Sequence, residues 1–202
     1  MRPMEFAKRT AANKAIDYFM EDPVSRIESM MATVNKMLPD ALFPSQRKAF
    51  NKAIEERNNW YQLICRVADL DPDVATGLLK CFLTEANLVA WDKQEKSREK
   101  YQCNIPWAVL LDPTSACNLH CTGCWAAEYG HKLNLSYDDI DSIINQANEL
   151  GTHVFIYTGG EPLVRKVDLI RLCEAHPDSA FLCFTNATLI DQAFVEEVAR
   201  VK

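Results

Sequence analysis

The chain has 202 residues, of which 48% are hydrophobic and 25% are charged, and its formal net charge is −6. These values are typical of folded globular domains and exclude a disordered or low-complexity protein. Residues 101–202 hold 13 acidic side chains against 6 basic ones, so a basic surface is missing and binding to a nucleic acid is disfavoured.

The first residues, from Met1 to Glu5, show neither a signal peptide nor a membrane anchor. They lead into a mixed-charge segment, and the longest apolar runs of the chain are far shorter than a membrane span. Eight cysteines without a secretory signal indicate metal or redox chemistry rather than a disulfide framework. We therefore expect a cytoplasmic protein with reduced thiols and no transmembrane segment.

Residues 1–104 predict an all-helical region. Apolar residues recur at helical spacing, and the pairs Asp22-Pro23 and Asp71-Pro72 each supply a cap followed by a first-turn proline. Several methionines follow this spacing, and the sequence leaves open whether they pack in a core or line an apolar groove for a ligand or partner. The longer predicted helices span residues 46–68 and 72–88.

Residues 105–202 follow a different pattern, in which short apolar runs alternate with helical segments. Alternation of strand and helix predicts right-handed crossovers and a parallel sheet, so this region is predicted to be α/β. The predicted strands are residues 107–111, 154–157 and 180–184, and the predicted helices are 136–150, 168–175 and from 191 onward.

Polar and sulfur-containing residues follow the end of each predicted strand. In parallel α/β sheets, the loops that leave the carboxyl ends of the strands carry the chemistry. The first such loop, residues 113–135, is longer than an ordinary connection. It is followed in the chain by a Thr-Gly-Gly-Glu-Pro segment at 158–162 and a Thr-Asn-Ala-Thr segment at 185–188. Three loops that converge on one edge of the sheet predict a functional site there.

Three of the eight cysteines, Cys117, Cys121 and Cys124, lie within eight residues of one another. Thiolates are ligands of zinc and of iron–sulfur clusters, and the number of ligands separates the two. A structural zinc ion needs four ligands, and His120 is the candidate for the fourth, although it directly precedes Cys121. A cluster of four irons held by three thiolates instead leaves one iron open to a substrate or cofactor.

The spacing of these cysteines, combined with the Gly-Gly-Glu-Pro motif at 159–162, resembles the radical S-adenosylmethionine (SAM) superfamily, with a maturase-like core. The resemblance implies a [4Fe-4S] cluster. Its three protein ligands would be Cys117, Cys121 and Cys124, and the amino and carboxylate groups of S-adenosylmethionine would chelate the fourth iron. The resemblance also implies an enzyme, classed as an oxidoreductase or transferase.

The same resemblance assigns a cofactor-binding role to the motif after the second strand. Gly159, Gly160, Glu161 and Pro162 would receive the amino group of S-adenosylmethionine, because glycines let backbone oxygens approach a cationic ligand. Reduction of the cluster would cleave the cofactor and generate a 5′-deoxyadenosyl radical, which abstracts a hydrogen from the substrate. The implied partners are an electron donor such as flavodoxin or ferredoxin and an unknown substrate, which is a peptide, a lipid or a small metabolite.

One residue of the cysteine segment departs from the superfamily pattern. The residue before the last cysteine is commonly bulky and packs near the adenine, whereas here it is Gly123. The adenine contact is therefore expected from the backbone at Gly123 or from Trp125, and Trp125 could equally be a packing residue. Asn186 matches a Thr-Asn turn seen after the third strand of related enzymes and is a further candidate for cofactor binding, although asparagine is also common in ordinary turns.

The length of the α/β region sets an expectation about the rest of the protein. The superfamily fold implied by the resemblance is a partial parallel (β/α) barrel of six units, which needs roughly 190 residues. Residues 105–202 number 98 and accommodate about three units, so we expect the first half of the barrel and a longer parent enzyme. The alternative to a radical SAM enzyme is a non-catalytic binding or electron-transfer module, in which every iron of the cluster has its full set of ligands.

Overall fold

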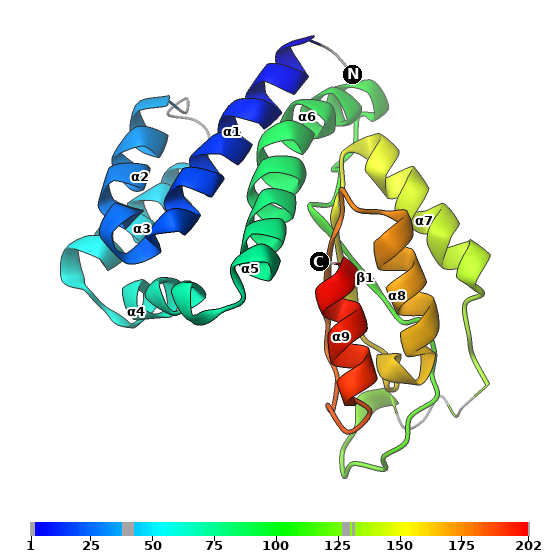
Figure 1. Ribbon diagram of the computed structural model, residues 1–202. Helices are drawn as coiled ribbons and strands as arrows, with labels where there is room; N and C mark the ends of the chain where they lie inside the picture. The colour runs from blue at the N-terminus through cyan, green and yellow to red at the C-terminus, as the bar shows by residue number, and fades with distance from the viewer. Residues whose placement is uncertain (1–2, 38–42, 127–129, 131, 202) are drawn as a thin grey trace. The chain divides into compact units, whose positions relative to one another are not determined.

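The computed structural model describes residues 3–37, 43–126, 130 and 132–201. The chain forms two compact units, Met1–Lys80 and Cys81–Lys202. Figure 1 shows a helical first unit in blue and cyan, and a second unit in which strands and helices alternate along the chain. Within the described ranges, no helix combines the length and the apolar character that crossing a bilayer requires.

The first unit is built from short helices around a small apolar core. Met20, Met30 and Met31 pack partly buried against this core, which favours core packing over a ligand groove as the role of these methionines. The buried members of the core are Phe19, Ile27, Ile54 and Tyr61. The elements are α1 (Pro3–Glu21), α2 (Pro23–Met37), α3 (Pro44–Glu56), α4 (Asn59–Cys65), the 3₁₀ helix η1 (Arg66–Asp69) and α5 (Pro72–Leu79).

The single helix predicted over residues 46–68 is wrong, because the chain breaks between α3 and α4. Arg57 takes the left-handed backbone conformation, with φ of 50°, and ends α3. The side chain of Asn58 then caps α4 by accepting a hydrogen bond from the amide of Trp60 (3.0 Å). The predicted starts at Pro23 and Pro72 are confirmed.

The second unit takes up the helical residues from 81 to 101 as well as the sheet. These residues lie in the π-helical segment η2 (Lys80–Val89) and in α6 (Ala90–Tyr101). Ala86 packs with Val154 and Ala180 of the sheet, and the Gln94 side chain donates a hydrogen bond to the carbonyl of Gly151 (2.7 Å). The compact units therefore divide at residue 80, whereas the predicted domains, 1–104 and 105–202, describe where the strand–helix units begin and stay a prediction.

The three predicted strands are present and form a parallel sheet in the order β1-β2-β3. The predicted helices between and after them are also confirmed. The elements are β1 (Ala108–Leu111), α7 (Tyr137–Leu150), β2 (Val154–Tyr157), the 3₁₀ helix η4 (Pro162–Arg165), α8 (Lys166–Ala175), β3 (Ala180–Cys183) and α9 (Gln192–Val201).

Alternate residues of the strands form the main core of this unit. Val109, Phe155 and Phe181 are neighbours in the strand register and pack on the same side of the sheet. On that side they meet the apolar faces of α7 and α8, which include Ile144 and Leu172. Figure 1 shows α7, α8 and α9 following one another along this unit, and contacts join α7 to α8 and α8 to α9.

Local sequence signals account for the ends of α7. Ser136 and Asp139 form a capping box, in which the Ser136 hydroxyl accepts from the amide of Asp139 (3.1 Å) and the Asp139 carboxylate accepts from the amide of Ser136 (3.0 Å). At the other end Gly151 has φ of 95° and terminates the helix. The capping box fixes the position at which the long loop after β1 ends.

Candidate metal and cofactor site

The residues predicted to carry the chemistry lie on the three loops that leave the carboxyl ends of the strands. β1 ends at Leu111, β2 at Tyr157 and β3 at Cys183, and the register places these three residues side by side. Because the strands are parallel, the loops that follow them emerge at the same edge of the sheet. The predicted convergence of the three loops is therefore confirmed.

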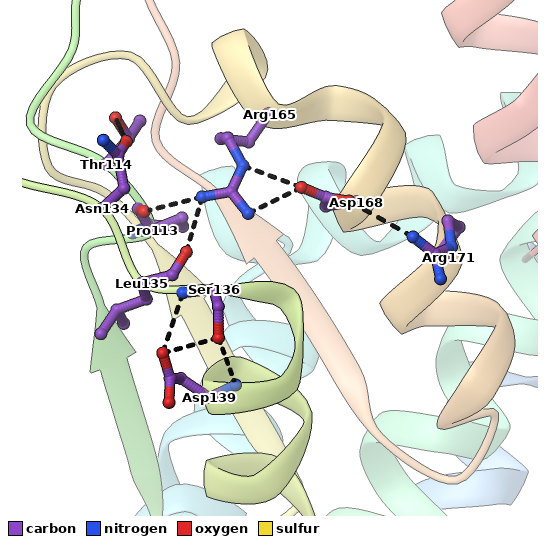
Figure 2. Close-up of polar contacts among 9 residues, drawn as sticks. All are labelled: Pro113, Thr114, Asn134, Leu135, Ser136, Asp139, Arg165, Asp168 and Arg171. Atoms are coloured by element: carbon purple, nitrogen blue, oxygen red, sulfur yellow. Dashed lines mark hydrogen bonds and ion pairs between the residues drawn. The ribbon is translucent and has the colours of Figure 1, made fainter.

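The long loop after β1 is closed at its base by paired backbone segments, residues 113–115 and 133–135, which we call the neck. Thr114 and Asn134 form an antiparallel bridge. The amide of Ser115 donates to the carbonyl of Leu133 (2.8 Å), and the amide of Leu135 donates to the carbonyl of Pro113 (3.1 Å). Figure 2 shows the neck residues Pro113, Thr114, Asn134 and Leu135 together. The cysteine segment is thus held between two fixed ends.

Gly159 and Gly160 are required by the way the second loop packs against the first. A Cβ atom on Gly160 would lie 2.3 Å from the carbonyl oxygen of Ala116, and one on Gly159 would lie 2.8 Å from that of Thr114. The amide of Gly160 donates to the Thr114 carbonyl (3.0 Å). The space left by the missing side chains is therefore filled by the backbone that leads directly into Cys117.

Glu161 connects the second loop to the other two. Its side chain is only 1% exposed, and its amide donates to the carbonyl of Ala116 (2.8 Å). One carboxylate oxygen accepts hydrogen bonds from the amide of Leu163 (2.9 Å) and the hydroxyl of Thr185 (2.7 Å), and the other accepts from the amide of Asn186 (2.8 Å). A buried carboxylate with these donors fixes the relative positions of the loops.

Pro162 is buried and begins η4 directly after Glu161, which caps this short helix. Proline suits the first position of a helix because an N–H group at that position would have no acceptor within the helix, so its absence costs no hydrogen bond. The whole Gly-Gly-Glu-Pro motif therefore has a structural role in holding the cysteine loop, in addition to the cofactor contact that the resemblance implies.

Asn186 links the third loop to the cysteine segment. Its side-chain amide donates to the Asn118 side chain (3.0 Å), and its side-chain oxygen accepts from the amide of Thr188 (3.0 Å). The Asn118 side chain in turn donates to the hydroxyl of Thr188 (2.7 Å). Because Asn118 directly follows Cys117, this set of hydrogen bonds reaches the first residue of the cysteine motif.

The three cysteines lie on the part of the loop beyond the neck. Cys117 is half-buried, whereas Cys121 and Cys124 are exposed. The amide of Leu119 donates to the sulfur of Cys117 (3.4 Å), and the amide of Cys124 donates to the carbonyl of Cys121 (3.2 Å). Across the described residues, no three His, Cys, Asp or Glu side chains form a group that could hold a metal ion, so the fit to a cluster rests on the donor chemistry of three thiols on one anchored loop.

Residues 111–202 match the sequence model of the radical SAM superfamily, and the matched stretch contains the last residue of β1, the strands β2 and β3, and all three loops. These residues form a radical SAM domain. Members of this superfamily use a [4Fe-4S] cluster and S-adenosylmethionine.

Curated relatives match parts of the chain. The chain is similar to an uncharacterized protein of Archaeoglobus fulgidus, with 31% identity over 107 residues, which make up 51% of this chain and 25% of that protein. A GTP 3′,8-cyclase of Geobacter sulfurreducens is 45% identical over 60 residues, 28% of this chain and 18% of the cyclase.

An AdoMet-dependent heme synthase of Methanosarcina barkeri is 28% identical over 99 residues, which are 47% of this chain and 28% of the synthase. The matched stretches thus make up 25%, 18% and 28% of the length of these three relatives, so the chain spans less than a third of each of them. No solved structure matches the chain at a significant level.

The departure at Gly123 has a backbone explanation in the radical SAM domain. Gly123 has φ of 75°, a left-handed conformation that residues other than glycine rarely adopt, and among the described residues beyond its two chain neighbours no heavy atom lies within 4 Å of the place where its Cβ would be. The neighbouring Trp125 is 59% exposed, so it is not a residue of the core. The backbone conformation of the turn therefore explains why glycine occupies position 123, and close contact with neighbouring atoms does not.

The partly buried cysteines of the second unit are unsuited to bind metal. Burial raises the pKa of Cys81 and of Cys173 to about 12 and that of Cys183 to about 11. Thiolates and not thiols are metal ligands, so at neutral pH these three groups stay protonated in the core. Their placement leaves Cys117, Cys121 and Cys124 as the candidate sulfur ligands at the carboxyl edge of the sheet.

The sequence did not reveal several residues that hold the site together. Asn118 directly follows Cys117, and Thr185 directly precedes Asn186. These positions beside the motif residues could have marked both as part of the site. Arg165, which contacts the neck of the loop, gave no such signal, because its partners Pro113 and Leu135 lie 52 and 30 residues away in the chain.

Proposed function

We propose that the radical SAM domain of this chain binds a [4Fe-4S] cluster through Cys117, Cys121 and Cys124 and uses it with S-adenosylmethionine for radical chemistry. The observation that carries the proposal is the presentation of three thiols, beyond an anchored neck, in a segment that matches the radical SAM superfamily. Three thiolates leave one iron of such a cluster for a non-protein ligand.

The residues around the cysteines support binding of the cofactor at the same edge. Gly159, Gly160, Glu161 and Pro162 form the wall directly behind the cysteine segment, and Asn186 joins it from the third loop. We propose that the half-buried backbone of Gly159 and Gly160 and the exposed backbone of Gly123 contact S-adenosylmethionine, while the Glu161 carboxylate keeps the wall in place. The exposed Trp125 is placed on the same segment as a candidate contact for the adenine.

The protein's own part in the chemistry is to hold the cluster ligands and the cofactor-binding residues in place. When bound, the cluster and S-adenosylmethionine supply reductive cleavage of the cofactor and a radical that abstracts hydrogen. The neck and the Gly-Gly-Glu-Pro motif fix the cysteine segment relative to the sheet, and the exposed Cys121 and Cys124 would keep the cluster accessible to a small electron donor such as flavodoxin or ferredoxin.

The fold supports a barrel rather than a doubly wound sheet. The strands follow one another in the order β1-β2-β3, each paired with its predecessor, and α7 and α8 cover the same side of the sheet. A doubly wound sheet reverses its strand order, and the helices that connect its strands lie on both faces. We therefore propose that these three units belong to a partial (β/α) barrel.

The proposal extends to the cofactor chemistry and leaves the substrate open among peptides, lipids and small metabolites. Relatives with different names, a GTP 3′,8-cyclase and a heme synthase among them, each match about half of the chain. Similarity to proteins with different names is expected to reflect what they have in common, which is the superfamily's cofactor chemistry.

The test is anaerobic reconstitution of the 202-residue chain with iron and sulfide. We expect about four irons and four sulfides per chain, and an electron paramagnetic resonance (EPR) spectrum of the reduced cluster that changes when S-adenosylmethionine is added. Replacing Cys117, Cys121 or Cys124 by serine should abolish the cluster. Cys103→Ser is the matched control, because Cys103 is also exposed but lies outside the motif.

Two results would contradict the proposal. Binding of colourless zinc in place of iron would identify a structural metal site. A cluster whose spectrum is unchanged by S-adenosylmethionine would indicate a fully ligated cluster, as in an electron-transfer module.

A further inference from the structure

Arg165 lies at the end of η4 and reaches both strands of the neck. One guanidinium nitrogen, Nη1, donates hydrogen bonds to the carbonyl oxygens of Pro113 (3.2 Å) and Leu135 (2.7 Å). These are the first and the last residues of the neck, 22 positions apart in the chain. Figure 2 shows the Arg165 side chain pointing at both carbonyls from the η4–α8 side.

Asp168 fixes the orientation of this guanidinium. Its Oδ2 atom accepts from Nε of Arg165 (2.8 Å) and lies 2.7 Å from Nη2. The two side chains are 19% and 25% exposed, so the pair is largely screened from water. Charge-assisted hydrogen bonds to a partly buried carboxylate restrict the guanidinium to one plane, and in that plane Nη1 faces the neck.

The contact from Arg165 is made where the backbone pairing of the neck ends. At Leu111 the chain leaves the sheet, and at Ser136 it enters α7, so the hydrogen-bonded pairing between the two segments ends at Pro113 and Leu135. Arg165 adds donors to both carbonyls at this open end. Arginine can serve a carboxylate and two carbonyls at once because its donors form a rigid fork, whereas a lysine ammonium cannot span these positions.

We propose that Arg165, oriented by Asp168, is a positioning residue that holds the neck closed and thereby sets where Cys117, Cys121 and Cys124 stand relative to the Gly-Gly-Glu-Pro wall. The part of this inference that concerns the cluster rests on the proposed function, and the closure of the neck stands by itself.

The test compares three variants of the 202-residue chain, Arg165→Lys, Asp168→Asn and Arg171→Lys. Arg171 is the matched control because its guanidinium also lies near Asp168, at 3.6 Å, but is 58% exposed, and among the contacts drawn in Figure 2 none joins it to the neck. In the metal-free chain, hydrogen exchange of the neck amides Ser115, Leu133 and Leu135 should be roughly tenfold faster in R165K than in the wild type. The interior of α7 should exchange at an unchanged rate.

Reconstituted protein gives the second measurement. We expect R165K to lose iron to a chelator about tenfold faster than the wild type, and the EPR spectrum of its reduced cluster to change, since residues behind the ligands commonly alter metal affinity by roughly 10- to 100-fold. D168N should show smaller changes in the same neck amides, and R171K should match the wild type.

The inference is overturned if the neck amides of R165K exchange as in the wild type, or if R171K shows the same losses. If R165K does not fold, D168N decides, and unchanged neck exchange in that variant also overturns the inference. A wild-type chain that takes up no cluster refutes the proposed function, while the hydrogen-exchange comparison still decides whether Arg165 closes the neck.

Discussion

The neck and the cysteine segment belong to one loop but differ in how firmly the protein holds them. Pro113 and Thr114 are buried, and the neck receives hydrogen bonds from its own two segments, from Gly160 and from Arg165. From Asn118 to Trp125 every residue is exposed. The fixed contacts thus lie behind the thiols, which stay accessible.

This difference teaches how a protein can prepare a site for a large cofactor. A cluster with an open iron needs ligands that can reach it and free space for a second molecule, so the ligand segment itself cannot be packed into a core. Precise placement then has to come from the ends of the segment. Substitutions that disturb either the contacts behind the thiols or the exposed cysteine segment therefore test this difference.

The largest effect is expected from Gly160→Ala. The added methyl would lie 2.3 Å from the Ala116 carbonyl, and both partners are backbone held by hydrogen bonds, so the neck has to move. We expect a loss of about 3 kcal/mol in the free energy of unfolding, measured by urea denaturation. Equal stability of the variant and the wild type would show that the second loop does not depend on this close approach.

Glu161→Gln should have the next largest effect. The new NH₂ group has to face either the amide of Asn186 or the donors from Leu163 and Thr185, so at least one donor meets another donor in a buried place. We expect a loss of about 2 kcal/mol in unfolding free energy. Glu149→Gln on the exposed end of α7 is the control and should change stability little; an equal loss in both variants would argue against a special role of Glu161.

The partly buried thiol of Cys173 on α8 predicts an alkaline loss of stability. Burial raises the pKa of Cys173 from 9.0 to about 12, so its contribution is complete below pH 9 and is lost as the pH rises toward 12. The unfolding free energy should fall by about 1.4 kcal/mol per pH unit for this thiol in that window.

Cys173→Ala tests this by urea unfolding at pH 8 and pH 10.5. The variant should be about 1 kcal/mol less stable at pH 8 but should have a shallower pH dependence. Cys103→Ala, which removes an exposed thiol, should keep the wild-type slope. An unchanged slope in Cys173→Ala would contradict the assignment.

Gly123→Ala should have the smallest effect, because it changes the accessible side of the contrast. The backbone at φ of 75° disfavours alanine by about 1 kcal/mol, but no neighbouring atom obstructs the new methyl. We expect iron uptake to stay within about twofold of the wild type. A loss as large as that of Gly160→Ala would mean that the cysteine segment is packed as tightly as the neck.

Patterns that depend on near neighbours in the chain could be predicted from the sequence. The capping box at Ser136 and Asp139, the stop at Gly151, the three parallel strands and the three-cysteine spacing were all visible. They were visible because hydrogen bonds and side-chain faces in helices and strands repeat every few residues, so the sequence itself contains the spacing. The break at Arg57 was missed because a left-handed arginine leaves no such pattern.

By itself the sequence determined the kind of fold, the edge of the sheet that carries the loops and the thiols that are candidates for metal binding. Only the tertiary structure decided why Gly159 and Gly160 are glycines, what the Glu161 carboxylate holds, and that Arg165 joins Pro113 to Leu135 across 52 and 30 positions. These contacts arise where separate loops meet in space, and their partners have no fixed separation along the chain. Their geometry is set by the packing of helices on the sheet, which brings the loops together.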